Sequence, residues 1–468
     1  MPESLGRFEP WLKRLIVLAA VTVLATIVGL GLLGRGVWWP HSGWSRALWA
    51  TTLAYGGLTY AAFVWRVCLW WRYRPMPPAP LSDLPSVCIV IPAYNEGSLV
   101  RHAIASAARS DYPADRLEII AVDDGSTDDT WVHILSAARA VRPDLRIRTL
   151  RQPRNTGKRL ALARGFAAAR GDVFVTMDSD SVVAPNALRS LVTPLVRDRR
   201  IGCVAGCVRV LNPRQGILTR FLKCTFSLSF RFVRAYQNEF RGVFCTPGAL
   251  SAYRADVVRR VLDEWLDQRF LGLPCVTGED RALTNLFLRD GWLTAYQGDA
   301  EVFARMPHTF GGVTAMFLRW ARSNIRETMI LYRFLFTRFR QRHLTAFRFN
   351  MILAALSLIL PPIMIAGGLY LAATQDGYFV RHVGLVILYA LTVSAIYYRN
   401  ERDGDWVWLL AYQFFWVACL SWIIPYAALT LRNTGWLTRG NPEAARDSTS
   451  DRSGLAAAPD AMTCPSPA

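Results

Sequence analysis

Five long apolar runs constrain the fold of this chain more than any other feature. The runs cover residues 15–33, 47–71, 349–373, 381–398 and 406–431. A helix of about 20 apolar residues crosses the hydrocarbon core of a bilayer. The first run lacks the polar stripe of a soluble helix, and a second run follows it without a small-residue cleavage site, which argues against a signal peptide. We therefore expect membrane-spanning helices on both sides of a soluble region.

The chain is strongly basic, with a formal net charge of +19. A nucleic-acid partner is one explanation, but Arg and Lys flank the apolar runs, for example at Lys13, Arg14 and Arg66. This placement is typical of contact with anionic lipid. The nine cysteines lack the spacing of metal ligands, so we expect reduced, mostly buried thiols and no zinc site. We predict membrane lipid as a partner and no nucleic acid.

The pattern of runs divides the chain into five regions. A Pro-rich connector at residues 75–85 forms a stiff exit from the membrane, and the C-terminal tail has almost no large apolar residue. We expect two transmembrane helices and the connector in 1–80, a cytoplasmic domain in 81–310, interfacial helices in 311–345, further transmembrane helices in 346–440 and a disordered tail in 441–468.

Strand-like and helical runs alternate in the soluble region. Short β-branched runs lie at residues 87–91, 117–122 and 172–177, and helical spacing lies at 97–110, 128–141 and 158–170. Strands buried on both faces and separated by helices predict a parallel, doubly wound α/β sheet. Because ligands of such sheets bind beyond the carboxyl ends of the strands, the pattern predicts one nucleotide-binding cleft there.

Polar motifs follow the first two predicted strands. Residues 92–96 (PAYNE) follow the first, and residues 123–129 (DDGSTDD) follow the second. A turn and a helix N-cap explain the end of the second motif. The adjacent acids Asp123 and Asp124 place like charges side by side, a cost that a ligand or cation normally offsets. We expect a carboxylate here to accept hydrogen bonds from a uracil imide or a ribose.

Two cations, Lys158 and Arg159, open the helix that follows residues 155–157 (NTG). A basic first turn opposes the helix dipole, and a local rule broken in this way often marks function. The segment is not a Walker loop, because the second glycine is absent. We expect these cations to meet either a uracil edge or a phosphate.

Asp178 and Asp180 follow the third predicted strand. Alternate residues of an extended segment share a face, so both carboxylates are expected to point into the cleft. Hard oxygen ligands suit Mg²⁺ or Mn²⁺, with a substrate diphosphate completing the coordination shell. The sequence therefore predicts a divalent-cation site.

Two further strings follow toward the C-terminus. Residues 277–281 (TGEDR) precede a helical run, where an N-terminal helix cap is an equally simple explanation. Arg319 and Trp320 form a pair that also occurs as an aromatic–cation contact at membrane interfaces. The stretches 217–236 and 325–342 combine aromatic residues with Arg, as interfacial helices do, although ordinary surface helices are the alternative.

Together these strings resemble the family-2 glycosyltransferases, specifically the processive membrane branch of hyaluronan, chitin-oligosaccharide, poly-N-acetylglucosamine and cellulose synthases. The resemblance covers roughly residues 86–440, and the order and spacing of the strings make it specific. It implies a glycosyltransferase-A-type, Rossmann-like, doubly wound α/β domain fused to an α-helical transmembrane region. One departure concerns the family's Q-x-x-R-W motif, which has Met316 here in place of Gln. A thioether cannot make the hydrogen bonds of that amide.

The resemblance also implies roles for individual residues. Asp180 would bind the metal, and residues 245–254 would shape the donor-sugar pocket. The implied UDP site consists of Ala93, Tyr94, Glu96, Asp124, Lys158, Arg159 and Asp178. Asp280 matches the general base that takes the proton of the acceptor hydroxyl. The implied diphosphate and acceptor contacts are Arg319, Trp320 and Arg439, the last in a W-x-T-R gating segment.

The resemblance implies inverting transfer from a UDP-sugar to a growing β-linked polysaccharide, with secretion across the plasma membrane. The expected donor is UDP-N-acetylglucosamine, alone or with UDP-glucuronate. A transferase that charges a lipid carrier is one alternative, and a transporter or receptor with a nucleotide-sensing domain is another. The crossings pose a conflict, because three C-terminal spans place Arg439 opposite the cytoplasmic catalytic domain. Either one run is re-entrant or interfacial, or the last folds back, or Arg439 does not gate the site.

Overall fold

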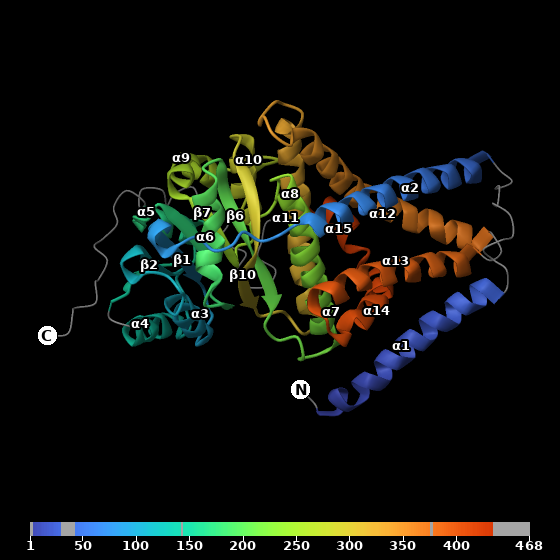
Figure 1. Cartoon of the computed structure of the whole chain (residues 1–468), viewed down its shortest axis with the longest axis horizontal. Helices are drawn as coiled ribbons and strands as arrows, with labels where there is room; N and C mark the ends of the chain where they lie inside the picture. Colours follow the sequence, from blue (N-terminus) through green and yellow to red (C-terminus); the bar gives the residue numbers. More distant parts are fainter. Residues whose placement is uncertain (1–2, 30–42, 142–143, 375–377, 434–468) are drawn as a thin grey trace.

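The computed structural model describes residues 3–29, 43–141, 144–374 and 378–433. An α/β body lies at one end, and long helices fan out from its other side (Figure 1). Arg439 lies outside the described residues, and so does the predicted gating segment apart from its first residue, Asn433. The predicted tail, 441–468, lies outside them as well.

An eight-stranded sheet forms the centre of the body, in the order β3-β2-β1-β4-β7-β6-β10-β5. Its strands are β1 (Val87–Ala93), β2 (Leu117–Asp123), β3 (Arg146–Arg151), β4 (Val173–Met177), β5 (Ser181–Val183), β6 (Ile201–Val210), β7 (Leu250–Arg254) and β10 (Leu293–Ala304). The strands β8 (Arg269–Phe270) and β9 (Leu273–Pro274) form a separate pair. The predicted α/β class is confirmed, and the three predicted strands correspond to β1, β2 and β4.

The sheet is mixed rather than wholly parallel, so that part of the prediction is wrong. β7 pairs antiparallel with both β4 and β6, and β5 pairs antiparallel with β10. The reason lies in the chain path between β6 and β7. Helices α7 (Ile217–Ser227) and α8 (Ala235–Glu239) and the π-helical η3 (Leu228–Arg234) follow the end of β6 without a crossover. The chain therefore enters β7 from the edge at which β6 ended and runs back.

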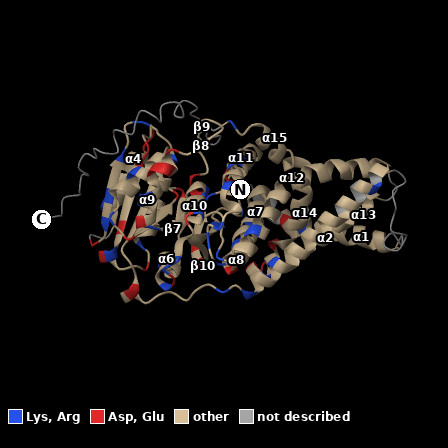
Figure 2. Cartoon of the chain, turned by 90° about the horizontal axis from the view of Figure 1, so that it is seen from above, with Lys and Arg blue, Asp and Glu red and all other residues tan. Residues whose placement is uncertain are grey.

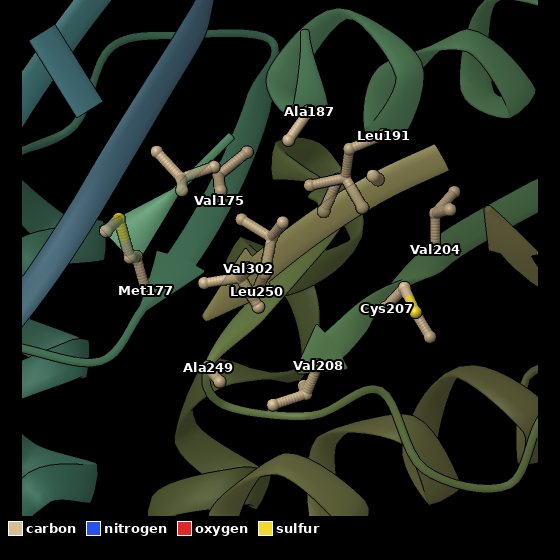
Figure 3. Packing of buried hydrophobic residues seen from close by; sticks show 14 of the residues in the cluster. Val175, Met177, Ala187, Leu191, Val204, Cys207, Val208, Ala249, Leu250 and Val302 are labelled. Atoms are coloured by element: carbon tan, nitrogen blue, oxygen red, sulfur yellow. The ribbon is translucent and has the colours of Figure 1, made fainter. Parts of the chain in front are cut away.

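Helices cover both faces of the sheet. α3 (Leu99–Ala108), α4 (Thr130–Ala140) and α6 (Ala187–Arg197) pack on one face, and α5 (Lys158–Ala168), α9 (Ala255–Leu266) and α10 (Glu279–Arg289) pack on the other. Strand residues alternate between the two cores, since Ile89 and Ile91 join the first while Cys88 and Val90 join the second. Figure 3 shows the first core around Val175, Leu191 and Val302. This double burial explains the continuous apolar runs of the strands.

The helical region contains α1 (Glu3–Gly29), α2 (Gly43–Arg72), α12 (Leu344–Thr374), α13 (Tyr378–Glu401), α14 (Val407–Phe415), the π-helical η5 (Trp416–Leu420) and α15 (Ile423–Leu429). Short 3₁₀ turns occur at Leu81–Asp83, Ala114–Arg116 and Gly404–Trp406. Among the described residues, four segments are long and apolar enough to cross a membrane: Phe8–Gly29, Leu344–Thr374, Tyr378–Glu401 and Gly404–Leu429. α2 is not among these four, so its predicted crossing stays a prediction. Most of the helical fan lacks the charges that cover the α/β body (Figure 2).

Two helical segments, the continuous run α7–η3–α8 and the helix α11, join the α/β body to the helices. α7, η3 and α8 bury the aromatic residues of the first amphipathic stretch against neighbouring helices, including Phe221 on Trp408 and Phe232 on Trp70. α11 (Phe310–Leu335) carries Arg319 and Trp320 together with most of the second stretch. Ion pairs reinforce the junction, as between Lys223 Nζ and Asp405 Oδ2 at 2.5 Å. The two regions are therefore held in one arrangement.

Candidate active site

A cavity of about 1090 Å³ runs from the carboxyl edge of the sheet to the helices α11, α12 and α15. The sheet forms the first half of this cavity, because β1, β2 and β4 are parallel and end at the same edge. Most of the predicted site residues that the structure describes line this cavity. They are Ala93, Tyr94, Asp124, Lys158, Asp178, Asp180, Asp280, Arg319 and Trp320.

Asp124 lies just beyond β2 and is almost fully buried. Its Oδ1 accepts hydrogen bonds from Gln152 Nε2 at 2.7 Å and from the Thr156 amide at 2.9 Å. Its Oδ2 accepts from the Gly157 amide at 2.9 Å. Burial raises the pKa of Asp124 to about 6, against the opposing effect of the hydrogen bonds from Thr156 and Gly157. Asp124 therefore fixes the loop that leads into α5 beside the cavity.

Lys158 bridges the two acidic motifs that the sequence places far apart. Its Nζ lies 2.5 Å from Asp178 Oδ1 and 3.1 Å from Glu279 Oε1. Burial alone would lower the pKa of Lys158, but the attraction of Asp178 and Glu279 outweighs burial and raises it. This pairing resolves the conflict with the helix dipole, because two carboxylates compensate the cation in the first turn of α5.

Asp280 lies in the first turn of α10 and lines the cavity beside the segment that precedes β7. Its Oδ1 accepts from the Arg281 amide at 2.7 Å, and its Oδ2 lies 3.4 Å from the Gly248 amide. The pKa of Asp280 is raised by burial and by the neighbouring Glu279, against the attraction of Lys158. A half-buried carboxylate with a raised pKa that faces a cavity has the features of a general base.

Glu96 and Arg159 lie outside the cavity lining. Glu96 Oε1 accepts a hydrogen bond at 3.2 Å from Ser179, the residue between Asp178 and Asp180. Arg159 donates to the Trp265 carbonyl at 2.7 Å and lies over the Trp265 ring. Adjacent helix residues point about 100° apart, which turns Arg159 away from the cavity that Lys158 faces. The sequence alone does not show which of two adjacent cations faces the cleft.

Asp180 is the candidate metal ligand, and its side chain lines the cavity near Asp178. Within the described residues, no cluster of three or more His, Cys, Asp or Glu side chains forms a complete metal site. The carboxylate fits Mg²⁺ or Mn²⁺ in another way, because such ions are often held by one or two carboxylates, water and a substrate phosphate. The cysteines in the described ranges are free thiols, and five of these eight are buried.

The second half of the cavity is lined mainly by aromatic and aliphatic side chains. Trp320 lies 5.8 Å from Phe226 and 5.9 Å from Phe317, measured between ring centroids. Phe317 in turn contacts Trp416 at 5.6 Å, which extends the row to the last apolar run. Met316 also faces this half and is 5% exposed. Leu358 of α12 and Ile423 and Ile424 of α15 complete the lining of this half.

Sequence reasoning did not place several of these residues at a site. Phe226 and Phe230 were expected only on an interfacial helix, and Trp416 only inside a membrane run. Two π-helical segments bring such residues to the cavity, since η3 contributes Ser229, Phe230 and Arg234 and η5 contributes Trp416. Single π-turns occur frequently at functional sites, but the sequence carries no clear signal for them.

Comparisons with known proteins agree with this geometry. Residues 88–262 match the sequence profile of Glycosyl transferase family 2. An N-acetylglucosaminyltransferase of Rhizobium leguminosarum bv. viciae is 32% identical over 364 residues, which cover 77% of this chain and 83% of the relative. An N-acetylglucosaminyltransferase of Sinorhizobium fredii is 31% identical and covers 78% of this chain and 87% of its own length.

A solved structure is similar in fold. It is a mannosyltransferase of Pyrobaculum calidifontis in complex with GDP-Man and Mn²⁺, with a TM-score of 0.58 and 21% identity. The match covers 82% of this chain and 99% of that one, so the likeness includes the helical region as well as the α/β body.

Proposed function

We infer the activity of this chain from a premise that its relatives establish: it belongs to glycosyltransferase family 2. We propose that it transfers N-acetylglucosamine from UDP-N-acetylglucosamine to the end of a growing β-linked oligosaccharide or polysaccharide. The observation that carries this proposal is one continuous cavity with Asp280 in its acidic half and Trp320 in its aromatic half. The names of the two rhizobial relatives support the choice of sugar.

The acidic half of the cavity suits the donor. Lys158 and Arg319 line it and carry the positive charge that a diphosphate requires, while the Asp124 loop borders the nucleotide end. Asp180 would hold Mg²⁺ or Mn²⁺ together with the diphosphate oxygens, and Asp178, which pairs with Lys158, would face the nucleotide. When bound, the ion neutralises charge on the departing nucleotide.

The proposed reaction is a direct displacement with inversion. Asp280 takes the proton of the acceptor hydroxyl, whose oxygen forms a bond to the anomeric carbon of the donor. The bond between that carbon and the diphosphate oxygen breaks, and the electron pair leaves with UDP. The Gly248 amide, 3.4 Å from Asp280 Oδ2, helps to hold the carboxylate in place.

The aromatic half of the cavity suits the acceptor. Sugar rings present apolar C–H faces, and the row Phe226, Trp320, Phe317 and Trp416 offers ring faces and edges along one path. That path ends at Leu358 and Ile423, on segments long and apolar enough to span a membrane. We propose that the product leaves by this path, which makes the enzyme processive and places it in the cell membrane with the α/β body in the cytoplasm.

Transfer to a lipid carrier is a second candidate. Met316, Leu358, Ile423 and Ile424 give the membrane side of the cavity an apolar character that also fits an isoprenoid chain. Both candidates use the same donor half and differ in the acceptor. The family relationship and the acidic cluster argue against the transporter or receptor alternative.

Radiolabelled donors test the proposal directly. Membranes that contain the full chain are incubated with labelled UDP-N-acetylglucosamine, with or without UDP-glucuronate, in Mn²⁺, in Mg²⁺ or in a chelator. Label in water-soluble oligomers or polymer supports the proposal, and the chelator should stop incorporation. Label confined to an organic extract supports the lipid-carrier candidate. Absence of incorporation from UDP-N-acetylglucosamine in either metal would overturn the proposed donor.

A further inference from the structure

A buried polar network lies beneath the loop that carries the candidate base. Glu327 on α11 is fully buried, and its carboxylate accepts hydrogen bonds from Gln268 Nε2 at 3.0 and 3.1 Å. Asn285 Nδ2 on α10 donates to Glu327 Oε2 at 3.0 Å and also to the Glu327 carbonyl at 3.0 Å. Burying a charged group costs free energy unless hydrogen-bond partners satisfy it. A buried carboxylate such as that of Glu327 is therefore expected to stabilise the fold or to serve the function of the site.

Neighbouring residues of α11 hold the base loop itself. The Arg326 guanidinium donates to the Thr277 carbonyl, and its Nε lies 3.3 Å from Glu327 Oε1. Gly278 packs so closely on α11 that a Cβ there would meet Ser323 Cβ at 2.7 Å, and its φ of +78° disfavours other residues. The loop that leads to Asp280 is thus fixed to α11 by a charged anchor and a close backbone approach.

The same face of α11 also lines the cavity. Arg319 and Trp320 precede Ser323 by four and three residues, and Arg326 and Glu327 follow it by three and four. Residues at these spacings share one face of a helix. One face of α11 therefore has two contacts. Its Arg319 and Trp320 line the cavity, and one to two helical turns later Arg326 and Glu327 bind the base loop and α10.

We propose that Glu327, together with Arg326, is a positioning residue that sets the spacing between Asp280 and the acceptor platform at Trp320. It touches no substrate and acts by locking α11 onto the loop and helix that present the base. This inference rests on the proposed function for its effect on rate, whereas the locking of the loop is independent of it. A misplacement of about 1 Å can cost a catalytic step about 100-fold.

The substitution Glu327→Gln tests the lock with little change of shape. An amide replaces one acceptor oxygen by an NH₂ donor, which then faces the donors of Gln268 or Asn285 and leaves Arg326 without its counter-charge. We expect hydrogen exchange to become faster in residues 277–283, kcat to fall about 30-fold and the dissociation constant of UDP to stay within about threefold. Glu327→Asp keeps the charge and should recover part of kcat.

The matched control is Glu264→Gln, which breaks an ion pair with Arg289 on the surface of the same region. It should leave exchange and kcat unchanged, because exposed pairs contribute little. If Glu327→Gln does not fold, Gln268→Leu removes a donor from the same carboxylate without altering α11 and should act in the same direction.

The readouts separate the possible results. Unchanged exchange in residues 277–283 would overturn the lock, and so would UDP affinity that falls in step with kcat, since that indicates general loss of structure. If wild-type protein transfers no sugar, the proposed function fails, while the exchange measurement still decides whether Glu327 holds the loop.

Discussion

At the strand edge of the cavity, charged side chains form ion pairs, whereas at the helical end aromatic rings pack in a row. The acidic half places Lys158 between Asp178 and Glu279, with Asp280 beside them. The aromatic half connects Trp320 to Trp416 through Phe317. The first half is arranged for electrostatic work on a small donor, and the second offers a repeated, weakly directional surface along which a sugar chain can lie.

This difference predicts separable effects of substitution. Electrostatic interactions in a buried site are strong and specific, so a change in the acidic half should alter turnover and its pH dependence. Ring contacts are individually modest and depend on area. A change in the aromatic half should alter acceptor affinity or product length and leave UDP binding intact. The largest effects are therefore expected in the acidic half and the smallest at the far end of the aromatic row.

The largest effect is expected for Asp280→Asn. The amide cannot accept the acceptor proton, and a general base contributes about 10² to 10⁴ in rate, so turnover should fall about 1000-fold. UDP release in the presence of acceptor measures turnover, and calorimetry with UDP and Mn²⁺ should show retained binding. Asp290→Asn, at the other end of α10, is the matched control and should keep wild-type turnover. Full activity of Asp280→Asn would remove Asp280 from the role of base.

The second-largest effect is expected in the pH dependence of kcat. The pKa of Asp280 is raised by burial and by Glu279, so the base becomes protonated at a higher pH than an ordinary aspartate. As pH falls through this raised pKa, kcat should decrease by about tenfold per pH unit. Glu279→Gln removes the neighbouring negative charge, which lowers the pKa of Asp280 and moves the acid limb to lower pH. A limb that moves upward or stays fixed would contradict this electrostatic coupling.

The acidic half is also the half that the sequence largely predicts. Strand-end acids and the cation at the start of a helix stand beside recognisable buried runs, so the sequence alone places Asp124, Lys158 and Asp178 at one edge of the sheet. What the sequence does not predict in this half is the direction of individual side chains. A helix turn of about 100° separates Lys158 from Arg159, and the sequence does not fix which of the two points inward.

The aromatic half depends on contacts between distant segments. Phe226 meets Trp320 across 94 positions of sequence, and Phe317 meets Trp416 across 99. An aromatic residue in an apolar run has the same local pattern whether it faces lipid, a helix or a cavity. The sequence does not predict the antiparallel direction of β7 for a related reason: that direction depends on the path of the helices that precede the strand.

In the aromatic half, Trp320→Ala should raise the KM for chito-oligosaccharide acceptors about tenfold, since a lost ring contact of about 1.4 kcal/mol corresponds to that factor. The dissociation constant of UDP should remain within about twofold, which distinguishes this variant from those of the acidic half. Trp320→Phe retains a ring and serves as the control, with a smaller change. A weakened UDP affinity together with an unchanged acceptor KM would break the proposed division of the cavity.

The smallest effect is expected at the far end of the row. Trp416→Leu removes an aromatic ring that lines the cavity beyond Phe317, and it should shorten the products or raise the acceptor KM about threefold, with turnover on short acceptors unchanged. Trp422→Leu is the matched control, because Trp422 lies in the same apolar run, is 43% exposed and is not part of the lining. Gel analysis of product length compares the two variants. If both shorten the product equally, the effect belongs to the packing of the last helices, and Trp416 has no separate part in the path of the acceptor.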